Sequence, residues 1–403
     1  MNGNSTFSNA YNDDPTSTLV AVDTSVVNMS QTIFTNLSSL SVSPLFNFQE
    51  LILYSDGVTV SGFDKTLFAL SNGEYIFSGL KISKGKMTWS NLQDAFMVNA
   101  IVFDVAQADL SLLSSSVDGI YSNYSSPVIY IDNDPTANQQ QTLLLNGSRF
   151  TNNVANISAG VLLSVNTNVT VDNCLFSGNA ALLGDGGALY LSCDKSMSIP
   201  CTYTVSNSVF SNNTAGVDGG AIKYDYYTPD IHLNNSFFNN KATYGPSVAS
   251  YPAQLQFINQ KRDLQMLNTS QVQKLGLPKT AVVFNMTTPL VSGSLITQGI
   301  TLKLQDQNGT SIVTDNSSVA EMYSLNSNVT VMKSKSVQAV NGQFLFNDVI
   351  VVGPPGSIIL LQITADSINP FMLSAAYPDL SFSSVYVQAY LRYCQAGEYQ
   401  TTD

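Results

Sequence analysis

The feature that most constrains the fold of this chain is an internal repeat near its middle. Four segments share the pattern Phe-x-x-Asn-x-Ala at spacings of 26, 34 and 27 residues, and each is followed by a turn of small residues and a short apolar stretch. The recurring residues are Phe150, Phe176, Phe210 and Phe237, with Asn153, Asn179, Asn213 and Asn240 three positions later. A period of about 20–30 residues is typical of solenoid proteins, in which every repeat packs only against its neighbours.

Side-chain alternation within the repeat predicts strands. In residues 168–171, two valines alternate with an asparagine and a threonine, and a period of two is typical of a strand with one buried face. Coils stacked about 4.8 Å apart would bury the recurring phenylalanines and alanines in one core. The asparagines would lie at a turn, where each amide can bond the equivalent residue one coil away, and Gly-Gly pairs would form a second corner. We therefore predict a right-handed parallel β-helix over residues 1–252, clearest in 140–250.

The motif Phe-x-x-Asn followed by Gly-Gly-Ala-[Ile/Leu] resembles the repeat of polymorphic outer-membrane proteins, which belong to the pectin-lyase-like β-helix superfamily. Similar repeats occur in very large surface proteins of ciliated protozoa. The sequence Cys-x-x-Gly-Glu-Tyr, which begins at Cys394, is similar to the opening of a cysteine-rich growth-factor-receptor-like module in those protozoan proteins. The resemblance implies a surface-displayed β-helix, and it implies that residues 393–403 begin a truncated module of this kind or form a tail.

The second half of the chain lacks the repeat. Residues 253–290 contain a stretch, 264–277, that could hold a short helix, and we interpret 253–290 as a connector. From 291 to 392, short alternating apolar segments are separated by turn dipeptides such as Asn-Gly. This pattern predicts an antiparallel β-sandwich of immunoglobulin-like type, so the expected fold class of the whole chain is all-β.

The composition limits the classes of function. Charged residues make up 11% of the chain, against roughly 25% in an average soluble domain. The net charge of -12 repels phosphate backbones, so nucleic acid is not expected as a partner. The single histidine, His232, excludes a histidine-rich metal site or a His–His acid/base pair, and its place between Ile231 and Leu233 favours a structural role.

Asn-x-Ser/Thr sequons occur fourteen times and predict an extracellular chain, in which sugar supplies the solubilising surface that charge does not. No apolar stretch of about 18–20 residues is visible. No signal peptide is visible either, and its absence favours a processed chain or a piece of a longer one. Covalent N-glycans are expected, and no other cofactor. The sequon asparagines are Asn4, Asn28, Asn36, Asn123, Asn146, Asn156, Asn168, Asn212, Asn234, Asn268, Asn285, Asn308, Asn316 and Asn328.

The four cysteines fit an oxidising compartment without forming a dense framework. Cys193 and Cys201 lie eight residues apart and could close a small disulfide loop. Cys174 lies in an alternating apolar stretch and is interpreted as a buried thiol, while Cys394 has no obvious local partner. No Cys-x-x-Cys occurs, which disfavours zinc.

Two pairs of aspartates are the candidates for chemistry. Asp185 and Asp218 each precede a Gly-Gly pair, so they would lie about 5 Å apart on adjacent coils and could form a carboxylate pair or a calcium site. Asp-Gly is also a common turn dipeptide, and the turn is the favoured interpretation. Asp132 and Asp134 resemble a calcium loop in composition but are interpreted as a plain loop. The tyrosine-rich segment 224–227 could stack on sugar rings, or form an exposed loop.

These features together predict a non-enzymatic extracellular glycoprotein that acts as a rigid surface, adhesive or filament-forming component. Stacked coils end in unpaired backbone groups, so we expect end-to-end association with other copies or with neighbouring surface proteins, and glycans are possible partners. Two alternatives stay open. One is a polysaccharide lyase or hydrolase that uses Asp185 and Asp218, and the other is a carbohydrate-binding module that uses the tyrosines.

Overall fold

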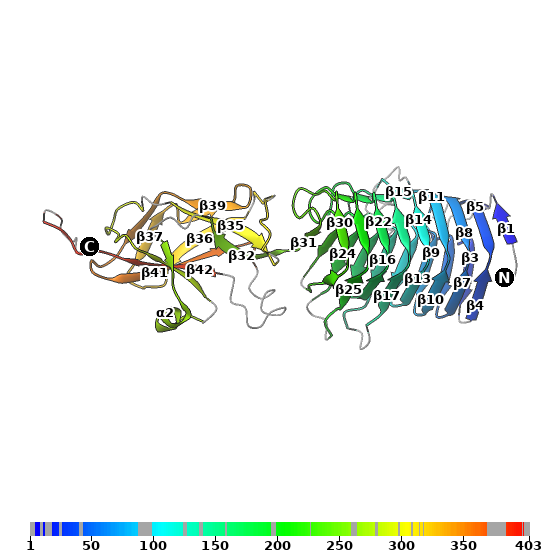
Figure 1. Cartoon of the computed structure of the whole chain (residues 1–403), viewed down its shortest axis with the longest axis horizontal. Coiled ribbons are helices and arrows are strands. Elements are labelled where there is room, and N and C mark those ends of the chain that lie inside the picture. Colours follow the sequence, from blue (N-terminus) through cyan, green and yellow to red (C-terminus); the bar gives the residue numbers. More distant parts are fainter. Residues whose placement is uncertain are drawn as a thin grey trace. The chain divides into compact units, whose positions relative to one another are not determined.

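The computed structural model of the chain divides into two compact units, Met1–Ser250 and Tyr251–Asp403, which are described separately (Figure 1). The structure describes residues 5–396 and 398, except for 9–10, 13–17, 24–25, 40–42, 88–98, 124–126, 137–139, 158, 195–198, 226, 259–263, 279–280, 297–298, 308, 314, 317 and 369–383.

In the first unit, the chain winds repeatedly through three sheets whose strands all pair in parallel. In the sheet of nine strands, each strand pairs with its equivalent one coil later, so that Leu162 lies opposite Leu189 and Leu189 opposite Ile222. The nine strands are, in sheet order, β3 (Val20–Asp23), β6 (Phe46–Gln49), β9 (Phe68–Ser71), β12 (Phe103–Ala106), β16 (Ile129–Asp132), β20 (Leu162–Val165), β24 (Leu189–Ser192), β28 (Ile222–Tyr224) and β31 (Val248–Ala249).

The other two sheets follow the same winding. The sheet of eight strands comprises β4 (Val26–Ser30), β7 (Ile52–Asp56), β10 (Glu74–Ser78), β13 (Asp109–Leu113), β17 (Thr142–Asn146), β21 (Asn168–Asp172), β25 (Tyr203–Ser206) and β29 (Asp230–Leu233). The sheet of fourteen strands comprises β1 (Ser5–Ser8), β2 (Tyr11–Asn12), β5 (Thr32–Ser39), β8 (Thr59–Phe63), β11 (Lys81–Met87), β14 (Ser116–Asp118), β15 (Tyr121–Ser122), β18 (Arg149–Thr151), β19 (Val154–Ala155), β22 (Leu175–Ser177), β23 (Ala180–Ala181), β26 (Val209–Ser211), β27 (Thr214–Ala215) and β30 (Ser236–Phe238).

The alternation seen in the sequence determines which side chains enter the core. In β21, Val169 and Val171 are buried, whereas Thr170 between them is exposed. In parallel register each inward side chain meets its equivalent on the next coil, as Val171 meets Val205, and the coils therefore bury one continuous apolar interior that no single coil could form. The prediction of an all-β chain with a parallel β-helix is confirmed.

The second unit is built from mostly antiparallel sheets. One has three strands in the order β32 (Pro252–Phe257), β35 (Ile300–Asp306) and β39 (Gln343–Phe346). A mixed sheet has six, in the order β33 (Leu264–Met266), β34 (Val282–Met286), β42 (Ser384–Tyr390), β41 (Ile358–Ala365), β36 (Val319–Ser324) and β38 (Ser336–Gln338). Strands β37 (Thr330–Lys333) and β40 (Val349–Val352) form a separate pair.

The connector and the wholly antiparallel arrangement that were expected in this half are both corrected. Residues 253–290 are no connector, because β32, β33 and β34 pair with strands of the second unit. The stretch 264–277 holds one short helix, α2 (Thr269–Lys274), whose first turn is capped by Asn268 and Gln271. The sheets are also not wholly antiparallel, since β34 and β42 run parallel.

Candidate functional site

The recurring asparagines form a continuous hydrogen-bonded ladder inside the β-helix. Nδ2 of Asn153 donates to Oδ1 of Asn179 at 2.9 Å, and Nδ2 of Asn179 donates to Oδ1 of Asn213 at 3.0 Å. Nδ2 of Asn213 continues the chain to Asn240 at 3.0 Å. Each of these acceptor oxygens also accepts the backbone N–H of the preceding asparagine, and Nδ2 of Asn179 donates in addition to the carbonyl of Phe150 at 2.9 Å. The first three amides are fully buried, so the ladder satisfies polar groups that would otherwise destabilise the core.

The recurring phenylalanines stack beside this ladder. Phe150 and Phe176 have ring centroids 5.1 Å apart, Phe176 and Phe210 4.8 Å, and Phe210 and Phe237 5.0 Å. The rings are nearly parallel, with interplanar angles of 10°, 4° and 8°. Ring stacking and amide bonding thus repeat together through four coils.

Cys174 belongs to a second ladder, at another corner of the coil. The backbone N–H of Ser115 donates to Oγ of Ser148, and the backbone N–H of Cys174 donates to Oγ of Ser208, each at 3.0 Å. Cys174 therefore takes the place that serine holds on other coils, and its thiol donates to the carbonyl of Asp172. Burial raises the pKa of the Cys174 thiol to about 11, so it stays protonated and unreactive.

Cys193 and Cys201 form a disulfide with a Cα–Cα distance of 6.1 Å. The bond closes the excursion between β24 and β25, which lengthens one repeat. Cys394 is an exposed free thiol in the second unit.

Asp185 and Asp218 have structural partners. The backbone N–H of Asp218 donates to Oδ1 of Asp185 at 3.1 Å, which ties the two coils together. Oδ2 of Asp218 pairs with Nζ of Lys223 at 3.1 Å, and Lys223 also donates to the carbonyl of Ser250. Burial raises the pKa of the Asp218 carboxyl, and the lysine opposes that shift. Sequence reasoning missed this ion pair because Lys223 lies five residues along the chain, on the outer face of β28.

Further acidic groups lie along the nine-stranded sheet, with Asp104 and Asp132 on β12 and β16 and Asp225 directly after β28. Together with Asp185 and Asp218, in the loops before β24 and β28, we call them the acidic face. Oδ2 of Asp225 accepts the Tyr190 hydroxyl at 2.8 Å, and Oδ2 of Asp132 accepts the Tyr130 hydroxyl at 3.3 Å. Burial raises the pKa values of Asp104, Asp132 and Asp225. Within the described part of the chain, no group of three or more His, Cys, Asp or Glu side chains is arranged to hold a metal ion.

The other candidate residues from the sequence, in the Asp134 loop, the tyrosine-rich segment and at His232, lie apart from one another. Oδ1 of Asp134 accepts the backbone N–H of Thr136 at 2.8 Å, which is a turn contact. Tyr224 is buried at 1% exposure in β28, so for this residue both the sugar-stacking and the exposed-loop interpretations are wrong. Tyr227 is half-buried, Tyr226 lies outside the described residues, and the backbone of His232 lies in β29.

The sequon asparagines differ in accessibility. Asn4 and Asn308 lie outside the described residues. Four are half-buried, and Oδ1 of one of them, Asn168, accepts two hydrogen bonds from Thr202. The half-buried members are Asn123, Asn156, Asn168 and Asn285, and the exposed members are Asn28, Asn36, Asn146, Asn212, Asn234, Asn268, Asn316 and Asn328.

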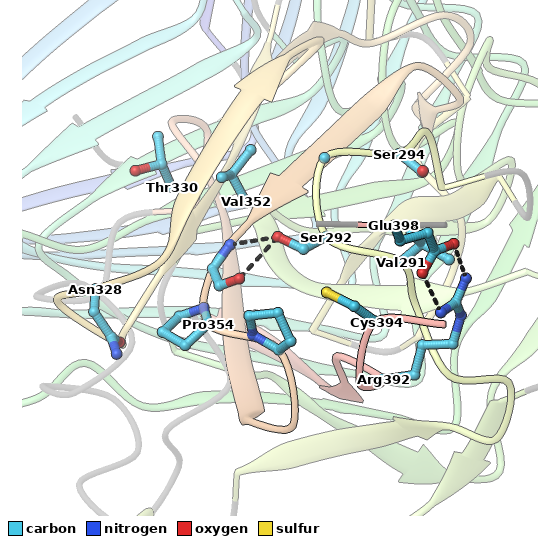
Figure 2. Close-up of a pocket in the computed structure, with 13 residues that line it drawn as sticks. Val291, Ser292, Ser294, Asn328, Thr330, Val352, Pro354, Arg392, Cys394 and Glu398 are labelled. Atoms are coloured by element: carbon cyan, nitrogen blue, oxygen red, sulfur yellow. Dashed lines mark hydrogen bonds and ion pairs between the residues drawn. The ribbon is translucent and has the colours of Figure 1, made fainter. Parts of the chain in front are cut away.

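The second unit contains an open hollow of about 690 Å³ (Figure 2). It is lined by the loop 291–294, the Pro354 turn, the start of β37 and the segment that follows β42. Arg392 and Glu398 form a two-pronged ion pair at its wall, with N–O distances of 2.8 and 2.7 Å. This hydrogen bonding lowers the pKa of Glu398 to about 2. Cys394 also lines the hollow.

The fold and ladders define a parallel β-helix protein built on a short sequence repeat. The model of the family described as the Chlamydia polymorphic membrane protein (Chlamydia_PMP) repeat matches residues 173–192 and 207–223. These segments hold two successive rungs of the phenylalanine and asparagine ladders, at Phe176 and Asn179 and at Phe210 and Asn213. The repeat of this chain is therefore similar to that of the polymorphic membrane proteins, while the similarity to protozoan surface proteins stays a prediction.

No curated protein matches the sequence. Among solved structures, the chain is similar to the crystal structure of Dettilon tailspike protein (gp208), at 9% identity over 91% of this chain and 85% of that one. The TM-score of this match is 0.15. No helix in the described residues is long and apolar enough to cross a membrane.

Proposed function

We propose that this chain is a non-enzymatic glycoprotein of the cell exterior, in which the β-helix serves as a stiff structural or adhesive element. The observation that carries the proposal is the asparagine ladder, together with the match of its two central repeats to the polymorphic membrane protein repeat. The family name supports a surface location, and fourteen sequons with few charged residues support a glycosylated surface.

Stiffness follows from how the coils are joined. Backbone pairing in three sheets fixes each coil to the next, and buried amide bonds and stacked rings also join the four coils that carry the repeat. Bending the stack would separate buried donors from acceptors on one side, and an unmade buried hydrogen bond costs about 1–3 kcal/mol. A stack held in this way suits a spacer that keeps other surfaces away from the cell.

The location can be tested on the native source. Antibodies against the first unit should label intact cells, and the intact mass should fall by several glycan masses after enzymatic removal of N-glycans. A cytosolic marker protein serves as the control for cell integrity. Labelling only after permeabilisation, with an unchanged mass, would refute the surface assignment.

The proposal includes end-to-end association. Strands β29, β30 and β31 end the three sheets of the β-helix, and edge strands present backbone groups that can pair with a partner. Phe238, in the edge strand β30, is 49% exposed. Phe238→Lys should therefore reduce self-association in sedimentation velocity, whereas Leu182→Lys, at an equally exposed site away from the edge strands, should not. A wild-type chain that stays monomeric at every concentration would refute this part.

The acidic face favours a second candidate, a carbohydrate-active or carbohydrate-binding surface. Its carboxyls with raised pKa values are the kind that exchange protons with sugar oxygens. Asp225→Asn, with Asp366→Asn in the second unit as control, tests this candidate against a panel of polysaccharides. Cleavage or binding that Asp225→Asn alone abolishes would favour the second candidate over the structural one.

A further inference from the structure

We propose that the hollow of the second unit is a seat for the innermost sugars of a glycan attached to Asn328. The inference rests on the proposed function, because it requires a secreted, glycosylated chain. Its starting point is that Asn328 and Thr330, the attachment residue and the hydroxyl residue of one sequon, both line the hollow. A sugar attached at the rim is held at a high effective concentration, so weak contacts suffice to keep it seated.

The loop that carries the Asn328 sequon is held in place by its neighbours. Asn328 is exposed, whereas Val329 is buried at 8% exposure and fixes the loop to the core. The backbone N–H of Val329 donates to the carbonyl of Asn326, and Oδ1 of Asn326 accepts the backbone N–H of Leu360 at 2.8 Å. Within the described residues the Asn328 side chain makes no hydrogen bond, unlike Asn168. Attachment of a sugar at Asn328 therefore breaks no native contact.

The turn beside the sequon gives the hollow a rigid apolar surface. The Ser292 hydroxyl donates to the carbonyl of Gly353 at 2.8 Å and accepts its N–H at 3.0 Å, which holds the turn in place (Figure 2). A side chain at Gly353 would meet Cγ2 of Val329 at 2.7 Å, so glycine allows the turn to pack against the sequon loop. Pro354 and Pro355 follow directly and line the hollow. Proline rings are stiff and apolar, and they suit the C–H face of a sugar ring.

The opposite wall is polar and charged. The Arg392–Glu398 pair and Ser294 line it. Because Arg392 lowers the pKa of Glu398 to about 2, the carboxylate is ionised at every physiological pH and can accept hydrogen bonds from sugar hydroxyl and acetamido groups. An apolar surface facing a few fixed polar groups, in a volume of 690 Å³, fits the usual form of a small-ligand site, about 300–1,000 Å³.

The test measures release of each glycan from the full chain, produced in a secreting eukaryotic host. Folded protein is treated with peptide N-glycosidase, and glycopeptide mass spectrometry follows each site over time. The glycan at Asn328 should be released roughly tenfold more slowly than those at Asn268 and Asn316, because a seated glycan is open to the enzyme for only about a tenth of the time. After denaturation the three rates should become equal.

Two variants distinguish binding of the glycan in the hollow from general steric crowding around Asn328. Ser294→Trp fills the hollow and should raise the release rate at Asn328 to that of the control sites, while Ser336→Trp, on the exposed strand β38, should leave it slow. Equal native rates at the three sites would overturn the seat. An unoccupied Asn328 beside occupied Asn268 and Asn316 would also overturn it, yet leave the proposed function standing. An absence of glycan at every sequon would overturn the seat and the glycoprotein assignment together.

Discussion

Replacing Asn179 tests whether the asparagine ladder stabilises the β-helix. The Asn179 side chain makes four buried hydrogen bonds, two as donor and two as acceptor. Asn179→Ala would leave the backbone N–H and one Nδ2 proton of Asn153 without acceptors in a fully buried site. At about 1–3 kcal/mol for each orphaned group, the expected loss is about 4 kcal/mol. This is a large share of a typical stability of about 5–15 kcal/mol.

Urea unfolding of the full chain, followed by circular dichroism, measures this loss. Glu74→Ala, at an exposed position on β10, is the control and should change stability by no more than about 0.5 kcal/mol. Asn179→Asp tests the direction in which stability changes with pH. Burial should raise the pKa of the new carboxyl above its unfolded value, so this variant should be most stable below the unfolded pKa and lose stability as the pH rises through the folded one. A loss below about 1 kcal/mol in Asn179→Ala, or greater stability of Asn179→Asp at pH 7 than at pH 4, would refute the reasoning.

Three further predictions concern single contacts. Replacing both Cys193 and Cys201 by serine should lower the unfolding free energy by about 2.5 kcal/mol, since the bond closes a short loop; an unchanged urea midpoint would contradict this. Cys174→Ser should be nearly neutral because serine holds the same ladder position on other coils. Cys174→Ala should cost about 1–3 kcal/mol because the backbone N–H of Ser148, which bonds the thiol, would lose its acceptor, and equal stability of the two variants would exclude the ladder role. An NMR titration should give Glu398 a pKa of about 2, rising towards 4.5 in Arg392→Ala, and identical values in both proteins would show that the ion pair does not form in solution.

The part of the fold that could be predicted is the part in which one side chain performs the same task on every coil. Asn179 and Asn213 bond their equivalents, and Phe176 and Phe210 stack on theirs, so the task appears as a recurring letter at a fixed spacing. The register of the coils then follows, because any other register would separate these pairs. The Asp218–Lys223 ion pair has no such signal, since its partners take part in it on one coil only.

The difference between recurring and single contacts also explains why the sequence predicted the earlier coils less clearly. The rings of Phe68 and Phe103 stack at 5.3 Å, and those of Phe46 and Phe68 lie tilted at 5.2 Å, yet the sequence around them lacks the Phe-x-x-Asn-x-Ala motif. These rings occupy the nine-stranded sheet, whereas Phe150 and its equivalents occupy the fourteen-stranded one. Earlier and later coils thus each pack ring against ring, but on different sheets, and between the two sets Phe103 lies opposite Ile129 and Phe150 opposite Val117. Stacking requires only that neighbouring coils agree, so a motif can fade along a β-helix while the core remains continuous.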